Sequence, residues 1–134
     1  MGRRLIVDTC VLIDMERGRR RLEDFAEDQD ELAIAAVTAA ELWAGAMRAD
    51  APRRRRRIEF FERAMEWFPV EDYTLDVALK HGELLAYAAS TGRQRGAHDL
   101  MIAATAAHTE RVLISRDGKA DFDGLPGVIV EYPK

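Results

Sequence analysis

Several features that mark particular classes of protein are scarce or missing in this chain of 134 residues. It has one cysteine, Cys10, so it cannot form an internal disulfide, and a reducing compartment is its natural setting. No apolar run approaches the ~18 residues that a membrane-spanning helix needs. The first apolar run begins at Leu5 and meets Asp8 at once, which is unlike a signal peptide. These absences predict a cytoplasmic protein with no membrane partner.

Internal repeats, low-complexity linkers and breaks in composition are also missing. With 48% apolar and 33% charged residues, the composition is typical of a globular protein rather than a disordered one. The length is close to the usual size of one domain. We therefore expect a single domain over residues 1–134.

Positive charge is slightly outnumbered by negative charge and is unevenly placed. The net charge is −4, yet the first 57 residues carry 12 of the 20 basic residues. Nine of these fall in Arg17, Arg19 to Arg21 and Arg53 to Arg57. Local Arg clusters can attract a polyanion even on an acidic protein. A general bias toward Arg, with solvated side chains, explains each cluster equally well, so the role of the Arg53–Arg57 run stays open.

Short apolar runs alternate with helical patterns along the chain. Strands are expected at 3–7, 32–37, 68–70, 112–115 and 128–131. Helices are expected at 9–16, 20–27, 39–49, 53–67, 74–91 and 99–109. This alternation predicts an α/β fold with a central parallel sheet of about four to five strands and helices on both faces.

Two of the expected helices carry apolar stripes at helical spacing. For the helix 53–67 the stripe consists of Ile58, Phe61, Met65 and, just beyond the helix, Phe68. One turn earlier it reaches Arg54 and Arg55, so the start of this helix should project beyond the body of the domain. In the helix 74–91, the side chains expected to face the core are Leu75, Leu79, Leu84, Leu85 and Ala88.

Four acids occupy comparable places in this pattern of elements. Asp8 and Asp117 follow expected strands, whereas Glu41 and Asp99 stand near the starts of expected helices. In an open parallel sheet such positions meet in the crevice at the carboxyl ends of the strands. Like charges gathered there raise one another's pKa unless a cation lies among them. Because oxygen ligands suit Mg²⁺ or Mn²⁺, the sequence predicts a metal-dependent site for phosphate transfer or hydrolysis.

Each acid also has a purely structural interpretation. Asp8 could cap the helix that follows it, and Glu41 could form a capping box with Thr38. Asp99 could cap its helix or complement the helix dipole, and Asp117 could be an ordinary turn residue. The prediction of a metal site fails only if all four structural explanations hold at once.

The phrases that surround these acids resemble those of a known family. The phrases are Val7-Asp8-Thr9, Thr38-Ala39-Ala40-Glu41-Leu42, His98-Asp99-Leu100-Met101-Ile102-Ala103-Ala104, Leu113-Ile114-Ser115-Arg116-Asp117 and Asp121-Phe122-Asp123-Gly124-Leu125-Pro126-Gly127. In this order they resemble the PIN-domain ribonucleases, and more narrowly the VapC-type toxins of bacterial type II toxin–antitoxin pairs. The resemblance covers essentially the whole chain.

The resemblance implies a PIN-like fold and an endoribonuclease that uses Mg²⁺ or Mn²⁺ to hydrolyse RNA phosphodiester bonds. Four acids would be catalytic and hold the metal: Asp8, Glu41, Asp99 and Asp117. Asp8 and Asp99 would be the principal ligands. Asp117 and Asp121 both match acids in the tail of the family. We favour Asp117 as the fourth acid, with Asp121 as a fifth candidate.

Polar residues near these acids are candidates for contact with substrate phosphates. They are Thr9, Arg93, Arg95 and Ser115. The resemblance further implies a homodimer of the toxin and a cognate VapB-type antitoxin, which would cover the acidic pocket with a basic side chain.

Other classes with acid clusters fit the chain less well. A receiver domain usually has two adjacent acids after its first strand, where this chain has Asp8-Thr9, and Glu71-Asp72 fits poorly as its phosphoacceptor site. A haloacid-dehalogenase-type phosphatase would need a second Asp where Cys10 stands. A noncatalytic PIN-like binder is the remaining alternative, and the presence of all four acids argues against it.

Overall fold

The computed structural model of the protein describes residues 2–92, 95–116 and 122–133. The strands are β1 (Arg4–Val7), β2 (Glu31–Ala35), β3 (Val70–Glu71), β4 (Val112–Ile114) and β5 (Val130–Glu131). The helices are α1 (Thr9–Glu16), the short 3₁₀ helix η1 (Leu22–Asp24), α2 (Ala36–Arg48), α3 (Ala51–Trp67), α4 (Leu75–Thr91) and α5 (Ala97–His108).

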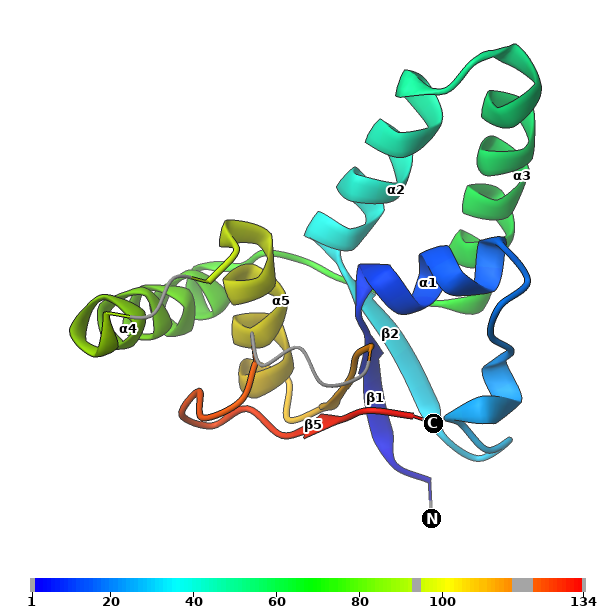
Figure 1. Ribbon diagram of the computed structural model, residues 1–134. Helices are drawn as coiled ribbons and strands as arrows, with labels where there is room; N and C mark the ends of the chain where they lie inside the picture. Colours follow the sequence, from blue (N-terminus) through cyan, green and yellow to red (C-terminus); the bar gives the residue numbers. More distant parts are fainter. Residues whose placement is uncertain (1, 93–94, 117–121, 134) are drawn as a thin grey trace.

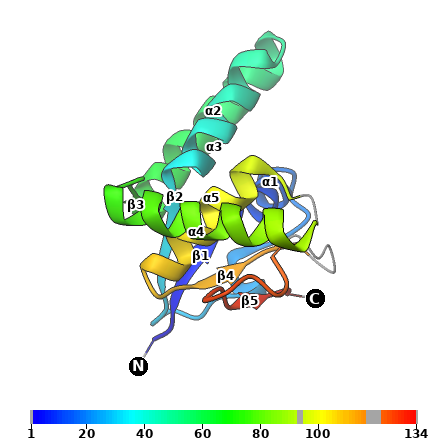
Figure 2. The ribbon, with the colours of Figure 1, turned by 90° about the vertical axis from the view of Figure 1, so that its left-hand side faces the viewer.

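The strands form one parallel sheet in the order β3-β2-β1-β4-β5 (Figures 1 and 2). Leu5 of the central strand β1 pairs with Leu32 of β2 and with Val112 of β4. Val7 pairs with Ile114, so β1 and β4 end at the same level. The predicted parallel α/β fold is confirmed.

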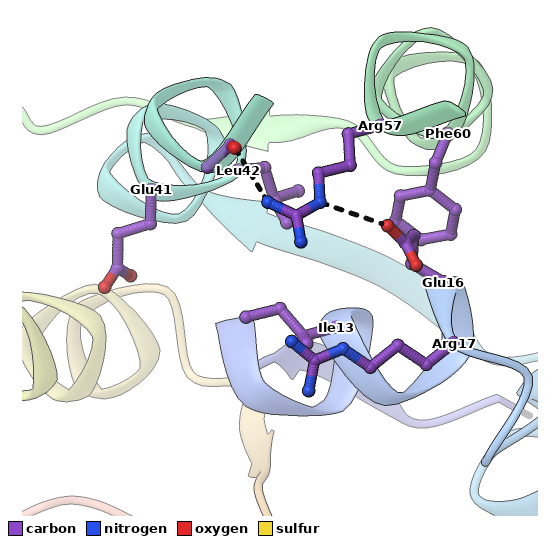
Figure 3. A pocket seen from close by; sticks show the side chains of 8 residues that line it. Ile13, Glu16, Arg17, Glu41, Leu42, Arg57 and Phe60 are labelled. Carbon is purple, nitrogen blue, oxygen red and sulfur yellow. Dashed lines mark hydrogen bonds and ion pairs between the residues drawn. The ribbon is translucent and has the colours of Figure 1, made fainter. Parts of the chain in front are cut away.

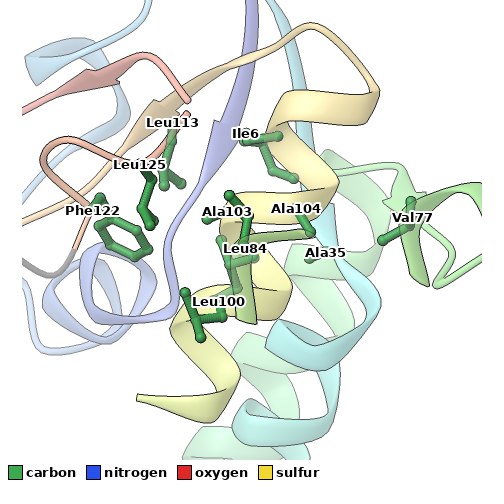
Figure 4. Close-up of a cluster of buried hydrophobic side chains, with 12 residues drawn as sticks. Ile6, Ala35, Val77, Leu84, Leu100, Ala103, Ala104, Leu113, Phe122 and Leu125 are labelled. Carbon is green, nitrogen blue, oxygen red and sulfur yellow. The ribbon is translucent and has the colours of Figure 1, made fainter. Parts of the chain in front are cut away.

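Helices cover both faces of the sheet because alternate residues of a strand point to opposite sides. Ile6 and Leu113 pack with α4 and α5 in one core (Figure 4). Leu5 and Val7 pack with α1 and α3 in the other. In the part of the chain that the structure describes, no helix is long and apolar enough to cross a membrane.

Helices α2 and α3 form a hairpin that projects away from the carboxyl ends of the strands (Figures 1 and 2). Asp50 caps α3 by accepting a hydrogen bond from the backbone N–H of Arg53 at 3.2 Å. The side chains of 53–56 are exposed at this end of the hairpin. The prediction that the start of the helix extends beyond the body of the domain is confirmed.

Two sequence predictions about element boundaries are wrong. The strand expected at 32–37 ends at Ala35, and α2 begins at Ala36, because an alanine-rich run suits a helix as well as a strand. The segment 20–27 forms only η1. Leu22 and Phe25 are its only large apolar side chains, too few for the buried stripe of an amphipathic helix.

The buried faces of two helices also differ from prediction. In α4, Leu75, Leu79 and Leu85 are 76%, 60% and 48% exposed, whereas Leu84 is buried. Apolar residues lie on more than one face of α4, so their spacing does not say which face packs on the sheet. In α3 the buried face is shifted from the expected stripe and contains Phe60 and Ala64.

Candidate functional site

Three of the four predicted acids line one cavity at the carboxyl ends of the central strands. Asp8 follows β1, Glu41 lies in the second turn of α2, and Asp99 lies in the first turn of α5. The cavity has a volume of about 300 Å³, and its other lining residues are Thr9, Cys10, Ile13, Ser115, Arg116 and Phe122. We call it the acidic cavity. The predicted acids Asp117 and Asp121 lie outside the described residues.

Asp8 is almost fully buried, 5% exposed, and is held by side chains and backbone. Its Oδ2 accepts hydrogen bonds from Ser115 Oγ at 2.7 Å and from the Cys10 thiol at 3.2 Å. Its Oδ1 accepts from the backbone N–H of Thr9 at 2.8 Å, which makes Asp8 the N-cap of α1. The pKa of Asp8 is raised, mainly because burial disfavours the charged form. The hydrogen bonds lower this pKa, and the nearby charge of Glu41 raises it. A cation would favour the charged form of this carboxyl group.

Glu41 lines the acidic cavity and does not cap its own helix, α2. Because α2 begins at Ala36, the capping box of Thr38 and Glu41 is not formed. Instead, Thr9 Oγ1 donates to Glu41 Oε1 at 2.6 Å, and His98 Nδ1 lies 3.2 Å from Oε2. Thr38 Oγ1 lies 3.0 Å from the Thr9 hydroxyl. The Glu41 carboxylate is therefore oriented by α1 and α5.

Asp99 is the third residue of α5, whose N-cap is Gly96. Asp99 is thus not the cap residue, although the start of the helix favours its negative charge. A Cβ atom at position 96 would lie 2.9 Å from Asp99 Oδ2. The glycine leaves room for the carboxylate at this point.

The donor atoms of the acidic cavity suit a hard divalent cation in kind. Asp8, Glu41 and Asp99 offer only oxygen atoms, the ligands that Mg²⁺ and Mn²⁺ prefer. Within residues 2–92, 95–116 and 122–133, no three acidic, histidine or cysteine side chains are grouped closely enough to hold an ion as they stand. A bound ion would therefore draw these carboxylates together or take further ligands.

Of the predicted substrate contacts, Thr9 and Ser115 line the acidic cavity and Arg95 does not. Thr9 and Ser115 are buried, and their hydroxyl groups bind the carboxylates rather than facing solvent. Arg95 donates to the backbone oxygen of Asp123 at 3.3 Å and lines a separate cavity beside α4 and the start of α5. Arg93 lies outside the described residues.

An ion pair at the edge of the acidic cavity was not identified from the sequence. Arg116 Nη2 donates to Asp14 Oδ1 at 2.8 Å, and Nε donates to Oδ2 at 3.2 Å. Arg116 Nη2 also donates to the backbone oxygen of Cys10 at 3.1 Å. Asp14 is only 8% exposed, so this two-point contact joins α1 firmly to the end of β4. The sequence feature that could have indicated this ion pair is the acid Asp14 within the largely apolar helix 9–16.

Cys10 is expected to resist alkylation in the folded protein. Burial and the neighbouring Asp8 raise the pKa of its thiol to about 12, so little reactive thiolate exists near neutral pH. Iodoacetamide should label the native protein on the order of 100-fold more slowly than the unfolded protein, as measured by mass spectrometry. Cys10 is the only cysteine, so every thiol adduct reports on it. Equal labelling rates in both states would contradict its partly buried position beside Asp8.

Comparisons with known sequences point to one family. The profile of the PIN domain matches residues 5–125. The chain is 36% identical over 125 residues to Ribonuclease VapC5 of Mycobacterium tuberculosis, which covers 91% of this chain and 87% of that protein.

Solved structures share the fold over nearly the whole chain. VapBC-5 from Mycobacterium tuberculosis, a member of the VapBC family of toxin–antitoxin systems, is 27% identical with a TM-score of 0.81, over 96% of this chain and 98% of that one. DNA-bound VapBC from Salmonella typhimurium is 25% identical with a TM-score of 0.85, over 98% of each chain. VapBC2 from Rickettsia felis, bound to a promoter fragment, has a TM-score of 0.86 over 98% of this chain and 99% of that one, and at 18% identity it shows the fold alone.

Proposed function

This chain belongs to the PIN-domain family, in the group that contains the VapC ribonucleases, and we propose that it is a metal-dependent endoribonuclease. The observation that carries the proposal is the acidic cavity, which Asp8, Glu41 and Asp99 line together. Burial of an acid such as Asp8 near another acid is unfavourable without a cation. The oxygen-only donor set of these three acids matches the ligands of a hard divalent cation, which favours a nuclease over a noncatalytic PIN-like binder.

We assign the acids distinct roles within this site. Asp8 and Asp99 would be the principal ligands of Mg²⁺ or Mn²⁺. Glu41 and Asp117 would complete the site or orient the attacking water, with Asp121 as the alternative fourth acid. A bound divalent ion supplies charge neutralisation at the phosphate and lowers the pKa of its water.

The hydroxyl groups around the carboxylates act as positioning groups in this proposal. Ser115 and the backbone of Thr9 fix the two oxygen atoms of Asp8. The Thr9 hydroxyl and His98 fix the two oxygen atoms of Glu41. Partners of this kind hold metal ligands in the orientation that binding requires. This role replaces the contact with substrate that the sequence suggested for Thr9 and Ser115.

The proposal is tested by RNA cleavage with purified protein. End-labelled structured RNA should be cut internally in the presence of Mg²⁺ or Mn²⁺, because the acids alone cannot neutralise the phosphate. EDTA should stop cleavage and excess Mg²⁺ should restore it, with the fragments resolved by gel electrophoresis. Cleavage that persists in EDTA would refute the metal dependence. Failure to cut any RNA with either ion would refute the nuclease.

We further propose that the chain is a toxin of the cytoplasm with a VapB-type antitoxin as its partner and that it forms a homodimer. The solved relative VapBC-5 belongs to a toxin–antitoxin family, which supports the antitoxin. Leu75 and Leu79, one turn apart and exposed on α4, offer an apolar surface that a second copy could cover. A monomeric mass by light scattering would contradict the homodimer.

A further inference from the structure

A second cavity lies between α1 and the α2–α3 hairpin, directly beside the acidic cavity (Figure 3). The two cavities share Ile13 and Glu41 in their linings. Phe60 contributes to the apolar part of the second cavity, and Arg17 and Arg57 contribute positive charge. We call it the α1–α3 groove. An RNA strand with its scissile phosphate in the acidic cavity could continue into this groove without leaving the surface.

One arginine from each Arg-rich segment of the sequence lines the α1–α3 groove. Arg17 directly follows the last residue of α1 and lines the groove. Arg57 reaches across from α3, with its Nε 3.6 Å from Glu16 Oε1 and its Nη1 2.9 Å from the backbone oxygen of Gly45. Figure 3 shows the Arg17 and Arg57 side chains entering the groove from opposite walls. Segments far apart in the sequence thus contribute to one basic surface.

Two further arginines extend this surface along α3. Arg53 lies four residues before Arg57, and Arg56 lies four residues before Phe60, so both continue the groove-lining face of α3 toward its projecting end. Arg53 makes only a long contact, with its Nε 3.9 Å from Asp50 Oδ2, and its side chain is 63% exposed. Within the described residues, the guanidinium groups of Arg17 and Arg56 contact no acid or other polar group.

Three other charged side chains in or near the groove already have partners, and one of them, Glu41, is held by Thr9 and His98. Glu16 is paired with Arg57, and Arg54 donates to the backbone oxygen of Met47 at 2.8 Å. The positive charge of Arg17, Arg53 and Arg56 is therefore largely free to act on a ligand. Arg53 and Arg56 are three residues apart, about 4.5 Å along the axis of α3, so their guanidinium groups can reach neighbouring positions on one ligand.

We propose that Arg17, Arg53 and Arg56 form a basic rail that binds the RNA backbone next to the scissile phosphate. This inference rests on the proposed nuclease function. The acidic cavity and the net charge of −4 both repel a polyanion, so substrate binding needs cations close to the cavity. The basic rail supplies these cations along the α1–α3 groove, which is continuous with the acidic cavity. An acidic protein segment is the competing ligand, and this continuity with the acids favours RNA over it.

The rail is tested by the salt dependence of RNA binding. An Asp99→Asn background prevents cleavage, and a short fluorescein-labelled single-stranded RNA of mixed sequence serves as the probe for fluorescence anisotropy. The triple change Arg17→Gln, Arg53→Gln and Arg56→Gln should weaken binding on the order of tenfold at low salt. The slope of log Kd against log salt should fall by about 2, since each lost contact removes ~0.7.

Two control variants separate lost charge from lost structure. Arg4→Gln removes one exposed charge at the amino-terminal end of β1, away from the acids, and should leave the salt slope unchanged. The triple Arg→Lys variant keeps the three charges and should bind close to the parent. An unchanged Kd and slope in the Gln variant would overturn the rail even if the wild-type protein cleaves RNA. Loss of binding to a copurifying protein, with RNA binding intact, would also overturn it.

Discussion

Replacing Asp99 by Asn is expected to abolish RNA cleavage while the fold persists. The amide is nearly isosteric with the carboxyl group, and Gly96 leaves space for either beside the first turn of α5. Asn cannot supply the negative charge that a divalent ion or an oriented water requires. The initial cleavage rate of labelled RNA in Mg²⁺ should fall by at least about 10²–10³-fold. Circular dichroism and the melting temperature should show an intact fold.

A matched control for Asp99→Asn is available in another helix of the chain. Asp76 is also an acid in the first turn of a helix, α4, but it is exposed and does not line the acidic cavity. Asp76→Asn should therefore retain cleavage close to that of the parent. Undiminished cleavage by the Asp99→Asn protein would reveal a contaminating nuclease or a wrong assignment of Asp99. Equal losses in both variants would point to a general effect of these helix starts.

The acidic cavity could be predicted because its acids are tied to features that sequence patterns show well. Asp8 directly follows an apolar run, and the pairing of Val7 with Ile114 brings the end of β4 to the same level. A parallel sheet then leaves little freedom in where Asp8 and Ser115 lie. The hydrogen bond between them depends on side-chain positions in two separate elements, which spacing in a single sequence does not contain.

Glu41 shows how a small error in a boundary changes the interpretation of a residue. With a helix that starts at Thr38, Glu41 is a capping residue; with the observed start at Ala36, it is in the second turn and faces the cavity. Helix starts in alanine-rich runs are weakly determined because alanine suits the interior of the helix as well as its end. The wrong prediction that Leu75 and Leu79 of α4 face the core has a similar cause. Apolar residues lie on several faces of α4, so the sequence does not indicate which face packs on the sheet.

Expression of this chain alone is expected to arrest the growth of a bacterial host, and co-expression of the neighbouring gene is expected to relieve the arrest. The acidic cavity concentrates negative charge, with the buried Asp8 near Glu41. A basic side chain from a partner could neutralise these acids in place of a metal, because guanidinium groups bind carboxylates at two points. The Arg116–Asp14 pair shows that the edge of the cavity already accommodates such a contact. Viable counts after induction should fall by orders of magnitude and recover with the partner.

The same experiment separates a toxin from a housekeeping nuclease. Asp99→Asn should remove the arrest without reducing the amount of soluble protein, because the growth defect depends on cleavage. An affinity tag on the chain should copurify the neighbouring product, and the complex should not cleave RNA until the partner is removed. A chain that is harmless at high expression and binds no neighbouring product would refute the toxin proposal. Cleavage of RNA in vitro by that same chain would leave the nuclease proposal in place, since metal-dependent hydrolysis at the acids does not require an antitoxin.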